Sequence, residues 1–181
     1  MPTALLIVDM LNRYEHEDAG SLAESVSHAV PQIRRLLSTA RDQNALVVYV
    51  NDNHDDWAAG RQELARWALA GSRPELVEPI IPPADVPLIL KARHSAFYAT
   101  QLEYLLRTRR IDRIVLTGQV TEQCILYSAL DAYVRHFNVI VPHDAVAHIH
   151  ADLGESALTM MSRNMGALIG TTDELIDSFE G

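Results

Sequence analysis

The sequence is poor in cysteine, in aromatic residues and in positive charge. Its single cysteine, Cys124, excludes an internal disulfide and is typical of a reducing compartment. The 15 basic residues stand against 24 acidic ones, and a formal net charge of −9 argues against nucleic acid and anionic membranes as partners. No apolar run approaches the ~20 residues of a membrane span. The N-terminal MPTALLIVDML lacks the basic flank and cleavage site of a signal peptide, so we expect a soluble, cytoplasmic protein.

What the sequence does have is an alternation of buried-strand and amphipathic-helix patterns. The 181 residues are 48 % hydrophobic and fit one domain, 1–181, with a real core. Short apolar runs at 3–9, 45–51, 87–91, 113–118, 138–142 and 166–170 predict six strands. Helical spacing separates them, and Ser21 with Glu24 predicts a capping box at the first helix. Strands that alternate with helices predict a doubly wound, parallel α/β sheet.

Three residues able to carry chemistry follow three of these strands. Asp9 ends the first strand, Lys91 ends the third, and Cys124 lies shortly after the fourth. Ligands of parallel sheets bind outside the carboxyl ends of the strands, so the topology brings these residues together. Each also has a structural interpretation: Asp9 as a loop cap, Lys91 as a snorkelling side chain and Cys124 as a packing residue.

The three side chains together suit nucleophilic attack on a carbonyl group. A thiol in the first turn of a helix and near a lysine is expected to have a lowered pKa. Asp9 would accept the thiol proton, Lys91 would favour the charged forms, and backbone N–H groups at the helix start would stabilise an oxyanion.

These motifs, LLIVDMLNRY, LKARHSAFYAT and LTGQVTEQCILYSALDAY, resemble those of the isochorismatase-like cysteine hydrolases, which include nicotinamidases and N-carbamoylsarcosine amidase. The resemblance covers nearly the whole chain. It implies a three-layer α/β/α sandwich with a six-stranded parallel sheet, a Rossmann-like arrangement, and an Asp9–Lys91–Cys124 triad. It also implies a cis peptide bond between Gln119 and Val120 and an oxyanion hole formed by the N–H groups of Val120 and Cys124.

The expected activity is hydrolysis of a C–N bond in a small planar amide, imide or ureido compound through a thioester on Cys124. Two alternatives stay open. An isochorismatase-type vinyl-ether hydrolase would keep its activity in Cys124→Ala and lose it in Asp9→Asn. A non-catalytic binding protein on the same scaffold would have an ordinary thiol pKa, near 8.5, at Cys124.

Further residues are candidates for binding substrate, and a metal is not expected. Nicotinamidases have a D-x-H metal motif, which Asp52 and His54 match, but no further histidine follows before His94. Two ligands on one loop make a poor metal site, so we expect no metal and no cofactor. By sequence proximity or aromatic character, the candidate substrate-binding residues are Asn12, Tyr14, Trp57, Phe97, Gln119 and Gln123. The expected partners are a small-molecule substrate and, from the resemblance, further copies of the chain in a homodimer or homotetramer.

Overall fold

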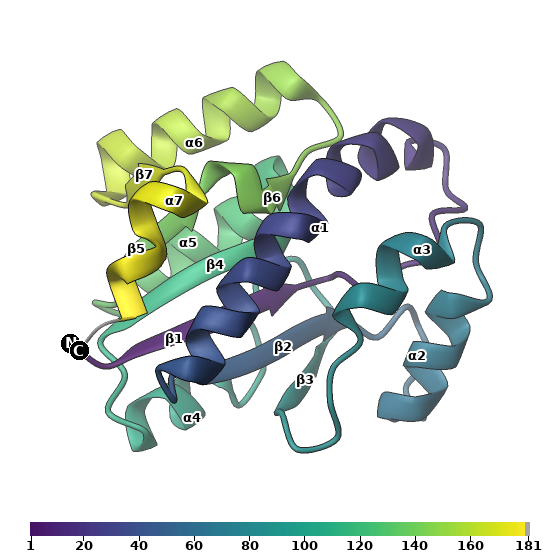
Figure 1. Ribbon diagram of the computed structural model, residues 1–181, viewed down its shortest axis with the longest axis horizontal. Helices are drawn as coiled ribbons and strands as arrows, with labels where there is room; N and C mark the ends of the chain where they lie inside the picture. The colour runs from purple at the N-terminus through teal and green to yellow at the C-terminus, as the bar shows by residue number, and fades with distance from the viewer. Residues whose placement is uncertain (180–181) are drawn as a thin grey trace.

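One parallel sheet forms the centre of the molecule (Figure 1). The structure is a computed structural model, and it describes residues 1–179. Six strands form the main sheet in the order β3-β2-β1-β4-β5-β7, and a seventh, β6, pairs with β4. The strands are β1 (Thr3–Val8), β2 (Leu46–Asp52), β3 (Leu88–Lys91), β4 (Arg113–Gln119), β5 (Asn138–Pro142), β6 (Val146–Ala147) and β7 (Leu168–Gly170). The expected parallel α/β sheet is therefore confirmed, with one additional short strand.

The additional strand β6 has only two residues. It continues the sheet beside the end of β4, where Gly118 lies opposite Val146 and Gln119 opposite Ala147. A strand this short contains no alternating or continuous apolar pattern, so the sequence did not distinguish it from a loop.

Helices cover both faces of the sheet, which confirms the three-layer α/β/α sandwich. In Figure 1, α1 crosses one face while α4 and α5 lie behind the other. No helix within residues 1–179 is long and apolar enough to cross a membrane. The helices are α1 (Ala19–Asp42), α2 (Arg61–Leu69), α3 (Pro74–Val77), α4 (Leu102–Thr108), α5 (Leu126–Val134), α6 (Ala151–Met165) and α7 (Thr172–Leu175).

The burial of β1 explains why its sequence is continuously apolar. All six residues of the strand are buried. Leu5 and Ile7 pack in the cluster that contains α1, whereas Leu6 and Val8 pack in the cluster that contains α5. A central strand with helices on both faces needs apolar side chains at every position, and this produces the pattern that the sequence shows.

The predicted capping box at the first helix is wrong. The helix α1 begins at Ala19, after Asp18, and no side chain caps its N-terminus. Ser21 therefore already lies inside the first turn, where its side chain is past the capping position. A capping box occurs instead at α7, where Thr171 accepts from the backbone of Glu174 and the Glu174 carboxylate accepts from the backbone of Thr171.

The strand order creates a switch point between β1 and β4. From β1 the chain adds β2 and β3 on one side, and from β4 it adds β5 and β7 on the other. The loops that leave the carboxyl ends of β1 and β4 therefore diverge to opposite faces and leave a crevice between them. Asp9 follows β1, and the segment from Val120 to Cys124 follows β4, so both lie at this crevice.

Gly118 permits the close approach of β1 and β4 at the switch point, and replacing it is expected to destabilise the fold. Its φ is +108°, and an added Cβ would overlap the Val8 carbonyl oxygen and come within 2.8 Å of the Val8 nitrogen. Backbone strain and steric overlap together predict that Gly118→Ala lowers the free energy of unfolding by about 3 kcal/mol or more, as measured by urea denaturation.

Gly166→Ala is the matched control for this substitution. Gly166 also has a positive φ, +66°, but nothing lies within 4 Å of its added Cβ. Only the strain of a positive φ applies to alanine at this position, so we expect the free energy of unfolding to fall by about 1 kcal/mol. Equal losses in the two variants would show that the contact with Val8 is not what requires glycine at position 118.

Candidate active site

Asp9 is held at the end of β1 by the neighbouring strand. Its φ is +55°, a left-handed conformation that aspartate adopts more readily than most residues. Its backbone N–H donates to the Val50 carbonyl (2.9 Å), and its Oδ1 accepts from the Asp52 N–H (2.7 Å). With Oδ1 occupied in this way, Oδ2 is turned toward Lys91, 2.8 Å from Nζ.

Lys91 reaches Asp9 from two strands away. It ends β3, which β2 separates from β1, a distance of about 10 Å that a lysine side chain can largely span. The side chain is completely buried, and Nζ lies 3.7 Å from Oδ2 of Asp52 as well as 2.8 Å from Asp9. Burial lowers the pKa of Lys91, but the charges of Asp9 and its neighbours outweigh burial and the net shift is upward. Lys91 is therefore a buried cation whose charged form the neighbouring carboxylates favour.

Cys124 completes the predicted group of three. Its Sγ lies 3.7 Å from Nζ of Lys91, and 8 % of the residue is exposed. Lys91 thus contacts both Asp9 and Cys124, so the structure brings together the three residues singled out from the sequence. The cysteine lies in a π-helical turn, Thr121–Ile125, that precedes α5, and not in the first α-helical turn that the sequence suggested.

The expectation of a lowered thiol pKa is wrong. Burial raises the pKa of the Cys124 thiol, the negative charge of Asp9 raises it further, and Lys91 lowers it by less. The nearby helix start and lysine favour the thiolate, but the cost of burying a thiolate beside a carboxylate is larger. The resting group is accordingly a neutral thiol with a proton acceptor, Asp9, beside it.

This pKa direction predicts how Cys124 reacts with iodoacetamide. The thiolate is the reactive form, and a free cysteine with a pKa near 8.5 approaches its maximal rate by about pH 9.5. We expect the alkylation rate of Cys124 still to be rising steeply between pH 9 and pH 10. The alkylation rate is measured by quenching the reaction at a series of times, at pH values from 6 to 10, and following the mass increase of the protein by mass spectrometry. A rate that levels off below pH 8 would contradict the raised pKa.

Gln119 and Tyr14 surround the backbone of Asp9. The Gln119 side chain donates to the Asp9 carbonyl oxygen (2.6 Å) and accepts from the Tyr14 hydroxyl (3.4 Å). Both residues are buried, and the peptide bond between Gln119 and Val120 is cis, as the resemblance implied. The backbone of Val120 acts to lower the pKa of the Cys124 thiol. Tyr14 and Gln119, predicted to bind substrate, are thus engaged in fixing Asp9.

Asn12 and Gln123 lie on the two loops that leave β1 and β4. The Asn12 side chain accepts from the Tyr14 backbone N–H (2.7 Å), which closes a turn in the loop after β1. Gln123 directly precedes Cys124 and is half-buried. The loop after β1 is also held from β2, where the Asn51 side chain accepts from the Leu11 N–H (2.9 Å) and donates to the Leu11 carbonyl (3.2 Å).

A cavity of about 330 Å³ lies beside Lys91. Trp57, predicted to bind substrate, lines it and is 79 % exposed. Phe97, also predicted to bind substrate, does not line it. Its ring is buried in the core against Phe137, with centroids 5.9 Å apart. The neighbouring Tyr98 takes the place at the cavity, because the turn after β3 directs residue 97 inward and residue 98 outward.

His94 is a residue at the site that the sequence analysis missed. Its Nδ1 lies 3.7 Å from Sγ of Cys124, and its ring lies 5.4 Å from that of Tyr127, centroid to centroid. The available signal was its position three residues after Lys91, at the carboxyl end of β3. The sulfur thus has a lysine on its buried side and an exposed histidine on another.

Asp52 and His54, which match the D-x-H metal motif of nicotinamidases, are engaged in other contacts. The Asp52 carboxylate accepts from the His54 backbone N–H (2.8 Å) and lies near Lys91. Nε2 of His54 contacts the Leu11 carbonyl (3.0 Å), and the ring lies against Trp67 at 4.2 Å. Within residues 1–179, no three His, Cys, Asp or Glu side chains are arranged to hold a metal ion. The residues present do not fit a nicotinamidase-type metal.

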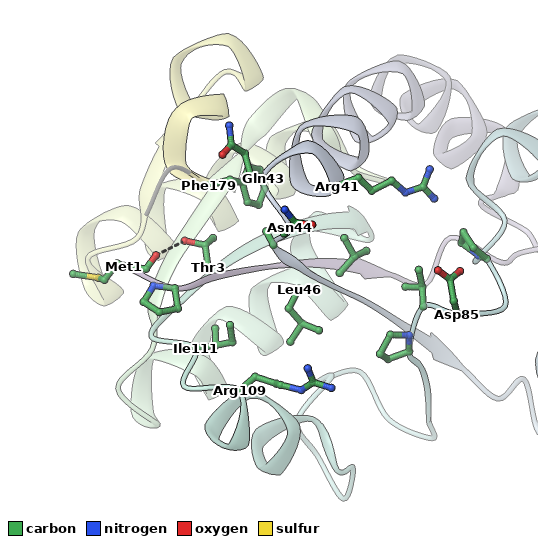
Figure 2. Close-up of a pocket in the computed structure, with 16 residues that line it drawn as sticks. Met1, Thr3, Arg41, Gln43, Asn44, Leu46, Asp85, Arg109, Ile111 and Phe179 are labelled. Atoms are coloured by element: carbon green, nitrogen blue, oxygen red, sulfur yellow. Dashed lines mark hydrogen bonds between the residues drawn. The ribbon is translucent and has the colours of Figure 1, made fainter.

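A larger cavity, about 1090 Å³, opens at the opposite edge of the sheet. Figure 2 shows Thr3 and Leu46, from the beginnings of β1 and β2, together with Ile111 from the segment before β4. None of Asp9, Lys91 and Cys124 lines it. Lys91 lines the smaller cavity, whereas Asp9 and Cys124 do not. Because catalytic groups of parallel sheets gather at the carboxyl ends of the strands, we assign the smaller cavity to this site.

Comparisons with known proteins relate the chain to one family. A family model described as "Isochorismatase domain" matches residues 3–174. An isochorismatase family protein of Bacillus subtilis, YaaI, is 33 % identical over 96 % of each chain. Maleamate amidohydrolase of Pseudomonas putida is 30 % identical over 95 % of this chain and 84 % of its own. The crystal structure of N-carbamoylsarcosine amidase from Thermoplasma acidophilum, 29 % identical, covers both chains completely with a TM-score of 0.75.

The match of a family model to nearly the whole chain, together with the fold and relatives named as amidohydrolases, leads to one conclusion: this chain belongs to the isochorismatase family and is a hydrolase.

Proposed function

We propose that this hydrolase cleaves the C–N bond of a small amide, imide or ureido compound through a thioester on Cys124. The observation that carries the proposal is the contact of one buried ammonium, Lys91, with both the Asp9 carboxylate (2.8 Å) and the Cys124 sulfur (3.7 Å). A nucleophile and a proton acceptor bridged by a fixed charge suit acyl transfer. The amidohydrolases among the relatives support the same reaction class.

In the first half-reaction, the sulfur attacks the carbonyl carbon while Asp9 accepts the thiol proton. The thiol is neutral at rest, so proton transfer accompanies attack. The N–H groups of Val120 and Cys124 stabilise the oxyanion of the tetrahedral intermediate. The C–N bond then breaks, and the proton held by Asp9 passes to the leaving nitrogen, which departs as ammonia or an amine.

In the second half-reaction, water attacks the thioester. Asp9 accepts a proton from the water, the C–S bond breaks, and the sulfur regains a proton. The sum is one amide and one water converted to one acid and one amine. Lys91 stays protonated throughout, because its pKa is raised, and it offsets the negative charge on Asp9 and sulfur. Tyr14 and Gln119 act as positioning residues that fix the backbone of Asp9.

Release of ammonia from a panel of small amides and ureides tests this function. We expect the wild-type protein to release ammonia from at least one compound and Cys124→Ala to release none. The isochorismatase-type alternative predicts that Cys124→Ala retains activity on a vinyl ether while Asp9→Asn does not. Turnover that survives removal of the thiol would therefore exclude the thioester mechanism.

We also propose that the chain forms a homodimer or homotetramer in the cytoplasm. Four large apolar residues on α5 are at least 43 % exposed: Tyr127, Leu130, Tyr133 and Val134. A stripe of this kind is unusual on a monomer and supports contact with a second copy. Light scattering coupled to gel filtration measures the molar mass, and a value of about 20 kDa, that of the monomer, would contradict the proposal.

A further inference from the structure

We propose that the cavity beside Lys91 is the substrate pocket and that it selects uncharged or cationic amides over amides that carry a carboxylate. This inference rests on the proposed amidohydrolase function and goes beyond it by assigning a charge class to the substrate. The relatives include enzymes named for carboxylates, such as maleamate and ureidoacrylate, so the family alone does not decide this question.

The walls of the cavity suit a flat, apolar group. Leu90, Ala92 and Ala99 supply aliphatic surface, and the side chains of Trp57 and Tyr98 line the cavity while remaining 79 % and 59 % exposed. Exposed aromatic rings at a cavity are available to stack on a planar ligand. The volume of about 330 Å³ is at the lower end of the range for small-molecule sites, so the cavity suits a ligand with one ring.

Asn53 offers the cavity a hydrogen-bond donor. The residue is buried, and its Oδ1 accepts from the Asp55 backbone N–H (3.2 Å). That contact fixes which end of the amide carries the nitrogen. Nδ2 donates to no acceptor within residues 1–179, and Asn53 lines the cavity. Its amide group is therefore available to a neutral acceptor on the ligand, such as a carbonyl oxygen or a ring nitrogen.

The charges at the cavity oppose an anion. Lys91 is the one basic residue among those that line the cavity, and its ammonium is engaged by Asp9 (2.8 Å) and Asp52 (3.7 Å). Asp56 lines the cavity as well, and one of its carboxylate oxygens accepts from the Ala58 N–H (3.0 Å). Two carboxylates already share the single lysine, and Asp56 adds a third. A ligand carboxylate in this cavity thus meets a net negative charge.

The other basic residues near the site do not change this charge balance. Arg13 is paired with Glu15 (2.7 Å) and lies over the Trp67 ring, 5.8 Å from its centroid. Arg93 and His94 follow Lys91 but do not line the cavity. A carboxylate-bearing substrate would need the side chain of Arg93 or His94 to reorient into the cavity. Substitution of these two residues is therefore a direct control for the proposal.

Three ligands of one shape test the charge class. Benzamide, 4-(aminomethyl)benzamide and 4-carbamoylbenzoate share a ring and a carboxamide and differ in charge. We expect the Cys124→Ala protein, which binds without turning over, to bind benzamide and the cation at least tenfold more tightly than the anion in titration calorimetry at pH 7.5. Equal or tighter binding of 4-carbamoylbenzoate would overturn the proposal, as would the failure of all three compounds to bind.

Substitutions inside and outside the cavity test whether the cavity determines the charge selectivity. In the Cys124→Ala background, we expect Asp56→Asn to narrow the affinity ratio between benzamide and 4-carbamoylbenzoate severalfold. Asp112→Asn removes the same charge before β4, at the far edge of the sheet, and should leave that ratio unchanged. If Arg93→Gln or His94→Gln selectively weakened binding of the anion, a basic side chain from outside the cavity would be binding the carboxylate, contrary to the proposal.

The ammonia-release assay separates failure of this inference from failure of the proposed function. Suppose that the wild-type protein hydrolyses amides in a Cys124-dependent manner but prefers a carboxylate-bearing amide over its uncharged analogue. In that case the proposed function stands and the proposed charge class is wrong. If no amide is hydrolysed by the wild-type protein while benzamide still binds more tightly than its carboxylate analogue, the pocket assignment stands and the reaction is wrong.

Discussion

Replacing Cys124 with alanine is expected to lower kcat/KM for amide hydrolysis by on the order of 10⁴-fold or more. The sulfur is the atom that forms the bond to the acyl group, and Lys91 contacts both this sulfur (3.7 Å) and the Asp9 carboxylate (2.8 Å). Without the thiol, the remaining groups can bind the amide, but the protein has no nucleophile at the site to attack it. Initial rates of ammonia release over a range of substrate concentrations measure the effect.

The folded state of this variant provides the control. Cys124 contributes a small, 8 % exposed side chain to the core, so its truncation to alanine should cost little stability. We expect a thermal midpoint within a few degrees of the wild type and unchanged binding of substrate amides. If the variant folds, binds and still turns over amide at more than a few per cent of the wild-type rate, Cys124 is not the nucleophile.

Replacing Asp9 with asparagine is expected to have opposite effects on catalysis and on thiol reactivity. Loss of the proton acceptor should lower kcat/KM by about 10²- to 10⁴-fold. The same substitution removes the negative charge that raises the pKa of Cys124, while Lys91, which lowers it, remains. More thiolate is then present at neutral pH, and we expect alkylation by iodoacetamide at pH 7.5 to become at least tenfold faster.

Asp52→Asn is the matched control for Asp9→Asn. Asp52 also faces Lys91, but at 3.7 Å, and it is not among the groups that shift the Cys124 pKa. We expect a much smaller change in both turnover and alkylation. If Asp9→Asn slowed alkylation or left it unchanged, Asp9 would not be the group that keeps the proton on the sulfur, and its assignment as general base would lose its basis.

The sheet and the group Asp9–Lys91–Cys124 were predictable because both follow from simple periodicity. A strand buried on both faces must be apolar at every position, as β1 is, and a polar residue at the end of such a run marks the carboxyl edge of the sheet. Parallel topology then brings the strand ends together. The assignment of a reaction to these residues needed the family resemblance in addition.

The features of the site that the sequence did not predict depend on the direction of side chains and on their burial. Phe97 and Tyr98 are adjacent aromatic residues in a turn, and only the path of the backbone decides that Phe97 enters the core and Tyr98 the cavity. His94 comes within 3.7 Å of the sulfur through the same turn. The direction of the thiol pKa depends on how much water reaches Cys124, a property of the packed molecule that no spacing in the sequence expresses.

In the proposed mechanism, catalysis passes through an acyl group covalently bound to Cys124. Intact-mass spectrometry of the protein, quenched in acid within the first turnovers of a hydrolysed amide, tests it most directly. The prediction is a mass increase equal to the acyl group, located on the peptide that contains Cys124 and lost when hydroxylamine is added. A substrate that is turned over while no acyl mass accumulates on Cys124, even when deacylation is slowed at low pH, would contradict the thioester mechanism.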